Sequence, residues 1–123
     1  MSGPQRWWRR LFATHETLVA QDLLEEVLDR GADAIANVTP GQRVHLHGVL
    51  SSVTLRPESS LKALQAELFD GSGSLDLVWL GRRRIAGVTP GRSIDVVGRV
   101  VRHHGRLVVF NPRYSLVAPG VSE

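Results

Sequence analysis

Two segments of the sequence share a pattern that restricts the fold more than any other feature. TPGQRVHLHGVL occupies residues 39–50 and TPGRSIDVVGRV occupies residues 89–100, so each begins with Thr-Pro-Gly and has Gly at its tenth position. Pro-Gly favours the turn that leads into each segment, and a Gly within an apolar strand relieves crowding where the strand bends. The pattern predicts two strands at equivalent corners of a small, strongly bent barrel. A solenoid is excluded, because two distant copies with different intervening sequences cannot stack.

Alternating apolar and polar residues predict β-structure for most of the chain after Val38. Five strands are expected, at residues 43–54, 64–69, 75–80, 92–101 and 107–110. The residues at 70–74 include the glycines that a hairpin turn needs, and His103, His104 and Gly105 suit a second turn. We therefore predict a mainly β fold in which residues 42–116 form a closed five-stranded barrel, with the strands at 43–54 and 92–101 adjacent.

Residues 15–30 have the pattern of an amphipathic helix that precedes the barrel. Thr14 is a suitable N-cap, Glu16 lies in the first turn, and Gly31 suits the position just after the last turn. One side is apolar and the other acidic: Leu23, Leu24, Val27 and Leu28 form the first, and Asp22, Glu25, Glu26 and Asp29 form the second. We expect the apolar side to pack on the barrel, and Glu25, Glu26 and Asp29 to face water.

The start of the chain, at residues 1–13, is basic and aromatic and allows three interpretations. It contains Trp7, Trp8, Arg9, Arg10, Leu11 and Phe12. The segment could dock on the barrel beside the helix, bind a partner protein, or lie at a membrane interface, where Trp and Arg are common. Docking is favoured, because so short a segment without a second anchor binds membranes poorly. The chain then divides into an N-terminal segment with the helix at 1–36, a barrel at 37–118 and a tail at 119–123.

Length and composition exclude several classes of protein. A chain of 123 residues and 13.5 kDa corresponds to one domain. No apolar run approaches the roughly 20 residues that a membrane-spanning helix needs, and the start lacks the apolar centre of a secretory signal. The absence of cysteine excludes disulfides, Cys-based zinc sites and thiol catalysis. We therefore expect a soluble cytoplasmic protein without an integral membrane segment.

The positive charge is concentrated in the predicted barrel. The formal net charge is +3, but residues 1–36 contribute four basic against six acidic residues, whereas residues 37–118 contribute eleven against five. All the basic residues except Lys62 are arginines, whose planar guanidinium groups suit phosphates and stack on flat rings. This composition favours an anionic partner, of which nucleic acid is the commonest. The alternative is a surface that only provides solubility, with arginine favoured by codon usage.

The run ELFDGSGSLDLVWLGRRRIAGVTPGRSIDVVGRV, at residues 67–100, resembles the OB-fold of the anticodon-binding type. Similar runs occur in the wedge domain of RecG helicases and in small actinobacterial OB-fold nucleic-acid-binding proteins. The resemblance to RecG covers about residues 42–116. The resemblance to the small proteins covers nearly the whole chain, including the Trp/Arg-rich start, the acidic helix and the ending Asn111-Pro112-Arg113-Tyr114. These resemblances imply a five-stranded OB barrel and a nucleic-acid ligand, but they do not indicate a substrate.

An OB barrel binds its ligand on strands two and three and on the loops between strands one and two and between strands four and five. The candidate residues in these places are Arg56, Lys62, Phe69, Arg82, Arg83, Arg84, Arg102, His103, His104 and Arg106, with Arg99 and Arg113 as an extension. Phe69 either stacks with bases or closes the barrel end, and the three consecutive arginines either bind phosphates or form a solvated loop. Trp79 belongs to the core by alternation, although a bulge after Val78 would place it on the binding face.

The remaining polar residues indicate neither a metal site nor catalysis. His45 and His47 share one face of a strand, but zinc needs three or four ligands and no third is evident, so we expect two solvent-facing histidines and no cofactor. Known catalytic motifs are absent, so an enzyme is not expected. The sequence favours a protein that binds single-stranded DNA or RNA non-specifically. The alternative is an interaction adaptor, in which the barrel is a scaffold and the helix at 15–30 docks on a protein.

Overall fold

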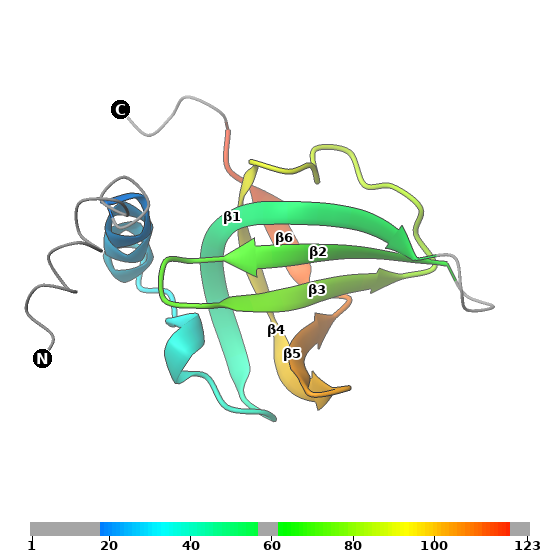
Figure 1. Ribbon diagram of the computed structural model, residues 1–123, viewed down its shortest axis with the longest axis horizontal. Coiled ribbons are helices and arrows are strands. Elements are labelled where there is room, and N and C mark those ends of the chain that lie inside the picture. The colour runs from blue at the N-terminus through cyan, green and yellow to red at the C-terminus, as the bar shows by residue number, and fades with distance from the viewer. Residues whose placement is uncertain (1–17, 57–61, 119–123) are drawn as a thin grey trace, which may run out of the picture.

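The computed structural model describes residues 18–56 and 62–118, which form a mainly β fold with one N-terminal helix at residues 18–29 (Figure 1). The other elements are the short 3-10 helix η1 (Ile35–Asn37) and the strands β1 (Arg43–Arg56), β2 (Ala63–Phe69), β3 (Ser74–Leu80), β4 (Ser93–His103), β5 (Arg106–Phe110) and β6 (Arg113–Leu116). The expectations for residues 1–13, for Thr14 and Glu16, and for the tail at 119–123 lie outside the described residues.

The two Thr-Pro-Gly segments form equivalent turns, as their shared sequence predicts. Gly41 and Gly91 have φ angles of 92° and 88°, a conformation that glycine adopts without a steric penalty. In each turn, the amide of the residue after the glycine donates to the carbonyl of the threonine, at 3.2 Å and 3.1 Å. Each turn leads directly into a long strand, β1 in the first case and β4 in the second.

The strands close into a five-stranded barrel in the order β1-β2-β3-β5-β4, because β4 also pairs with β1. β1 curves strongly, so that its first half lies beside β4 and its second half beside β2 (Figure 1). Val49 lies at the bend and pairs with both Phe69 and Ser93. The predicted adjacency of the strands at 43–54 and 92–101 is therefore confirmed.

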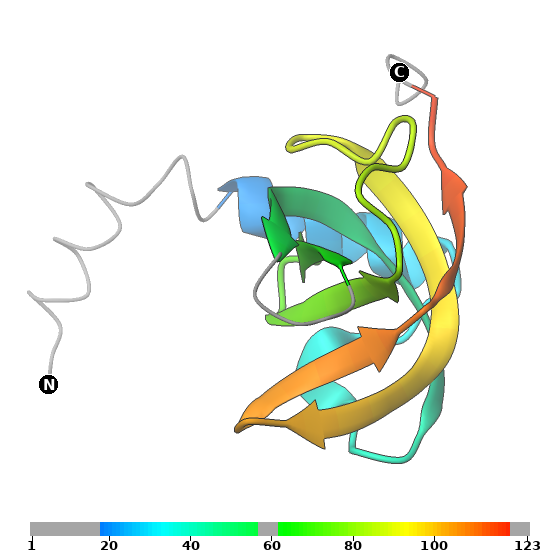
Figure 2. The same ribbon diagram turned by 90° about the vertical axis from the view of Figure 1, so that its right-hand side faces the viewer.

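A short sixth strand, β6, was not predicted. It follows β5 along the same edge of β4, as Figure 2 shows, after a break at Asn111 and Pro112. Pro112 cannot donate a ladder hydrogen bond, and Asn111 has a positive φ of 51°. The two residues therefore divide what would otherwise be one continuous strand.

The side chains that alternate inward from all five barrel strands fill the core. Trp79 is one of them and is buried, and the β2–β3 register is regular up to this residue. The core interpretation of Trp79 is therefore correct. Asp70 is also buried. Its carboxylate accepts hydrogen bonds from the backbone amides of Ile35 (2.8 Å), Ser72 (2.8 Å) and Gly73 (3.1 Å) at one end of the barrel. This shapes the β2–β3 turn and attaches η1 to it.

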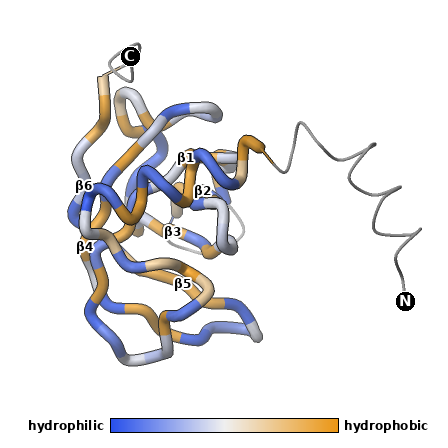
Figure 3. The backbone as a smooth tube through the Cα atoms, turned by 90° about the vertical axis from the view of Figure 1, so that its left-hand side faces the viewer, coloured by the Kyte–Doolittle hydropathy of each residue, from blue (hydrophilic) through white to orange (hydrophobic). Residues whose placement is uncertain are grey.

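The helix ends as the sequence predicts. Gly31 has a φ of 71°, its amide donates to the carbonyl of Leu28, and the next amide, that of Ala32, donates to the carbonyl of Val27. This is the Schellman arrangement. Figure 3 shows the helix in front of the barrel, with hydrophilic and hydrophobic residues alternating along its turns. Within residues 18–56 and 62–118, no helix combines the length and hydrophobicity needed to cross a bilayer.

The packed side of the helix is narrower than predicted. Val27 is fully buried and Leu23 and Leu24 are partly buried, but Leu28 is 65% exposed. Successive residues are about 100° apart around a helix, so a contact centred on Val27 turns Leu28 towards solvent. The expectation for Leu28 was therefore wrong. Glu25 and Asp29 are exposed as expected, whereas the side chain of Glu26 is 39% exposed and also contacts His47.

Candidate nucleic-acid interface

The outer face of β2, β3 and β5 carries the side chains that point away from the core. Gln65, Val78 and Phe110 are paired in one row across these strands, and Asp76 and Val108 are paired in the next row. Residues in register share a face of a sheet, so Val78, Val108 and Phe110 lie together on this outer face, next to Asp76. We call this surface, made of β2, β3 and β5, the outer β3 face.

An apolar cluster lies on the outer β3 face, separate from the barrel core. Ala63, Val78 and Val108 are buried there, and Val101 and Phe110 pack against them. Because the three central side chains are buried, the partly buried Val101 and Phe110 are the members of this cluster that a flat ring could contact. The ring of Phe110 is half-buried and meets the ring of His103 edge-on, with their centroids 5.5 Å apart.

Phe110 was missed in the sequence predictions. It has the same parity as Arg106 and Val108 on the last barrel strand, which was the available signal. The parity alone did not show that Phe110 lies beside β3. That placement depends on the long-range parallel pairing of β5 with β3. Phe69, the aromatic residue that was predicted, is also on the outside, at the end of β2, and it is half-buried.

Arg106 lies on the outer β3 face and is held by acidic neighbours. Its Nε and Nη2 donate to the two carboxylate oxygens of Asp76 at 2.7 Å and 3.0 Å, and Glu67 lies 3.5 Å from Nη2. The hydrogen bonds and charge of Asp76 raise the pKa of Arg106 above its ordinary value. The bidentate pair compensates the charge of Asp76, which is buried. The guanidinium group is still half-exposed, so its flat surface can contact a ligand.

Five predicted basic residues come together at one end of the face. Arg56 pairs with Ala63, and Ala63 pairs with Leu80, so the ends of β1 and β3 flank the start of β2. The amide of Gly81 donates to the carbonyl of Lys62 at 2.6 Å. The five residues, which we call the basic end, are Arg56, Lys62, Arg82, Arg83 and Arg84. All five are exposed, and within residues 18–56 and 62–118 none of them forms an ion pair.

The other predicted residues gather at the opposite end. Phe69 pairs with Ser74 at the start of β3, whereas Leu80 is at its end. Six residues of strand separate the two positions, which corresponds to about 20 Å. His103 pairs with Arg106 at the end where β3 begins, and Arg102 and His104 are next to them. Phe69 and the three consecutive arginines therefore do not contact one part of a ligand, and a strand that used both would have to run along the face.

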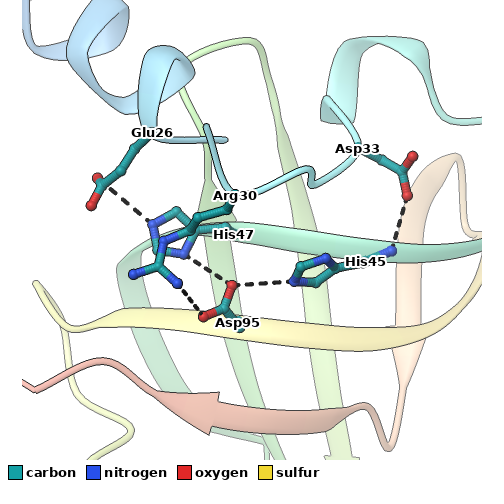
Figure 4. Close-up of polar contacts among 6 residues, drawn as sticks. All are labelled: Glu26, Arg30, Asp33, His45, His47 and Asp95. Carbon is teal, nitrogen blue, oxygen red and sulfur yellow. Dashed lines mark hydrogen bonds and ion pairs between the residues drawn. The ribbon is translucent and has the colours of Figure 1, made fainter. Parts of the chain in front are cut away.

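The two strand histidines contact other residues of the protein, in a cluster that joins the helix to β1 and β4 (Figure 4). His47 is only 1% exposed, with Nδ1 3.2 Å from Asp95 and Nε2 3.7 Å from Glu26. Nε2 of His45 is 3.3 Å from Asp95, which also accepts a hydrogen bond from Arg30 at 3.0 Å. The expectation that both histidines face solvent was wrong for His47, because the helix covers it. In the described part of the chain, no group of three or more His, Asp or Glu residues is arranged to hold a metal ion.

Comparison with known proteins identifies the fold. No family model matches the chain, and no curated protein matches it. Among solved structures, RecG bound to a three-way DNA junction matches 68% of this chain with a TM-score of 0.58 and 22% identity; the match covers 12% of the RecG chain. The second OB-fold domain of replication protein A from Methanococcus maripaludis matches 69% of this chain and 93% of that domain, with a TM-score of 0.51 and 16% identity. Together with the strand order and barrel closure, these likenesses show that the chain has an OB-fold.

Proposed function

We propose that this protein binds single-stranded nucleic acid, DNA or RNA, with little sequence preference, and that it is not an enzyme. The observation that carries the proposal is the arrangement of the outer β3 face, where the basic end lies beside an apolar cluster against which the half-buried ring of Phe110 packs. Cationic side chains beside a stacking surface are the usual means of sequence-independent single-strand binding. The resemblance to small actinobacterial OB-fold proteins supports the same conclusion.

The proposed contacts divide into two kinds. The basic end neutralises backbone phosphates and releases counterions, which provides affinity without reading sequence. Bases lie over the apolar cluster and stack on Phe110, with His103 and His104 beside it. The carboxylates of Glu67 and Asp76 lie on the same face and oppose an anion, and Arg106 compensates part of that charge. The acidic helix lies on another side, near Asp95.

One observation favours the second candidate function, that of a protein-interaction adaptor. The helix exposes Leu18 (52%) and Leu28 (65%) to solvent. An amphipathic helix that leaves large apolar side chains in solvent can place them against a protein partner. In that case the barrel is a scaffold and a protein partner binds at the N-terminal side, so nucleic acid is not needed.

Fluorescence anisotropy distinguishes the two functions. Labelled single-stranded DNA, single-stranded RNA and duplex DNA are titrated with the full chain at two salt concentrations. We expect the single strands to bind more tightly than the duplex, and the logarithm of the affinity to fall linearly with the logarithm of the salt concentration. An absence of binding to all three probes at low salt would contradict the proposal and favour the adaptor.

A further inference from the structure

Two arginines lie directly opposite each other on a second outer surface, away from the basic end. Arg43 of β1 pairs with Arg99 of β4, and both side chains are exposed. Like charges at directly opposed positions destabilise a sheet, and neither arginine has an ion-pair partner among the residues the structure describes. Nη1 of Arg99 donates to the carbonyl of Gly41 at 2.6 Å, which positions the guanidinium group while leaving other N–H groups available.

A third arginine lies in the neighbouring row of the same surface. Val97 of β4 pairs with His45 of β1 on one side and with Arg113 of β6 on the other. Arg113 is exposed and, in the described part of the chain, has no carboxylate at ion-pair distance. We call Arg43, Arg99 and Arg113 the arginine triad.

The surface beside the triad is hollowed. A shallow pocket of about 330 Å³ is lined by His45, Asp95, Val97, Arg113, Tyr114 and Ser115. The carboxylate of Asp95 would oppose an anion there, but it is already 3.0 Å from Arg30 and 3.3 Å from His45. A second carboxylate, that of Asp33, accepts the backbone amide of His45 at 3.0 Å. The three arginines outnumber this remaining acid, so the net charge at this surface is positive, and planar guanidinium groups suit the oxygens of a phosphate.

The triad also lies next to the outer β3 face. Val100 pairs with Val109 in the antiparallel β4–β5 ladder. Arg99 precedes Val100 on β4 and Phe110 follows Val109 on β5, so both residues lie on the same side of this pair. β6 then continues along the same edge of β4 (Figure 2). Arg113, the first residue of β6, comes three positions after Phe110, the last residue of β5. A nucleic-acid strand that leaves the stacking surface at Phe110 would pass over this part of β4.

From this geometry we propose that the arginine triad binds backbone phosphates of the same nucleic-acid strand, beyond the outer β3 face. The inference rests on the proposed function and extends it, because it lengthens the path of the ligand around the barrel. Its consequence is that the number of phosphates bound, and with it the salt slope, depends on the length of the nucleic-acid strand. A short strand occupies the outer β3 face alone, whereas a longer strand also reaches β1, β4 and β6.

The test compares two lengths of single-stranded oligonucleotide, roughly 6 and roughly 20 nucleotides, within and beyond the range that one OB-fold covers. The full chain and the variant Arg43→Ala/Arg99→Ala/Arg113→Ala are titrated at several salt concentrations. We expect the salt slope of the variant for the long strand to fall by about 0.7 for each phosphate that the triad no longer neutralises, with no change for the short strand. Replacement of all three residues by Lys keeps the charge and should restore most of the slope.

The outcomes separate this inference from the proposed function. If the wild-type chain binds neither oligonucleotide, the proposed function fails. If it binds both but the triple variant has the same slope for the long strand, only the triad assignment fails. Inorganic pyrophosphate is tested as a third ligand: binding that disappears in the variant, with unchanged long-strand affinity, would identify a site for free anions and overturn the assignment to nucleic acid. The double variant Arg43→Ala/Arg113→Ala leaves the bond from Arg99 to Gly41 in place and replaces the triple variant if that does not fold.

Discussion

Leu46 of β1 and Val96 of β4 lie directly opposite each other in the β1–β4 ladder, and they also hold the same position in the two Thr-Pro-Gly segments. An approximate two-fold axis therefore passes through this pair and relates one half of the ladder to the other. The turn glycines close the two ends in the same way: each donates its amide to a carbonyl of the other strand, at 2.6 Å and 2.7 Å. The internal repeat is thus a property of the ladder as well as of the sequence.

Replacement of Gly48 by Ala should destabilise the barrel. A Cβ atom at Gly48 would collide with the carbonyl oxygen of Phe69 on the neighbouring strand, and this backbone cannot move without disturbing the β1–β2 ladder. We expect a loss of roughly 1–3 kcal/mol in the free energy of unfolding, as for other overpacked sites. Gly73→Ala is the control, because its Cβ would lie 3.3 Å from the Cγ2 methyl of Ile35, a tight contact but one without the collision with backbone that occurs at Gly48. Denaturant unfolding that gave equal losses for the two variants would contradict this explanation.

The helix should be sensitive at Val27 and insensitive at Leu28. Val27 is fully buried, whereas Leu28 is mostly exposed. We expect Val27→Ala to cost about 1–2 kcal/mol, at the lower end of the range for large-to-small changes because the side chain is small. Leu28→Ala should change stability by less than about 0.5 kcal/mol. A larger loss at Leu28 than at Val27 in thermal unfolding would mean that the helix packs through a different side.

Replacement of Asp76 by Asn should increase the affinity for nucleic acid. The change removes a negative charge from the outer β3 face and weakens the bidentate pair that holds Arg106. The released guanidinium group can then contact a phosphate, which should steepen the salt slope by roughly 0.7. Glu67→Gln removes a charge of the same sign but leaves the pair with Asp76 intact, so its effect should be smaller. Salt-dependent anisotropy measures both, and an affinity reduced by Asp76→Asn would contradict the prediction.

The three consecutive arginines should contribute through charge alone. Replacing Arg82, Arg83 and Arg84 together by Ala should weaken binding of single strands similarly for all sequences, because phosphate contacts carry no sequence information. The salt slope should flatten by roughly 0.7 for each phosphate that these residues no longer neutralise. These residues are exposed, so the melting temperature should be nearly unchanged. Equal affinity of the wild type and the triple variant at low salt would remove the basis for assigning the basic end.

The aromatic residues should behave in the opposite way. Phe110→Ala and Phe69→Ala should each cost roughly 1–3 kcal/mol of binding free energy for every base that stacks there. The salt slope should stay the same, because stacking releases no counterions. Leu80→Ala is the control, since Leu80 is an exposed apolar residue of β3 without a ring. If Leu80→Ala weakened binding as much as Phe110→Ala, general apolar contact would explain the effect better than stacking.

The fold was readable from the sequence because its strongest constraints are local. The Thr-Pro-Gly turns, the glycine-rich turn at residues 70–74 and the helix end at Gly31 each depend on a few neighbouring residues, and alternation then assigned Trp79 to the core. The extra strand β6 was missed, because its pairing with β4 is long-range.

The surfaces were harder to predict, because alternation says which side chains leave the core but not what covers them. His47 has the parity of a solvent-facing residue and is buried only because the helix lies over it. In the same way, nothing near Arg106 in the sequence indicates its partner, Asp76, which is thirty positions away. The sequence predictions also placed Phe69 and the three consecutive arginines on one face without showing that they lie at its opposite ends. Strand order is easier to predict from a sequence than the position of a residue along the paired strands.

The pairing of β1 with β4 also has a consequence for the order of folding. β2 and β3 are joined by the short turn at residues 70–73, and such hairpins form within microseconds. The β1–β4 ladder joins residues 44 to 56 positions apart, from Val49 with Ser93 to Arg43 with Arg99, so loop-closure entropy opposes it until most of the chain is available. During synthesis, the first half of β1 must therefore leave the ribosome with an unpaired edge and wait for β4. We expect this interval to be when the chain is most prone to aggregate.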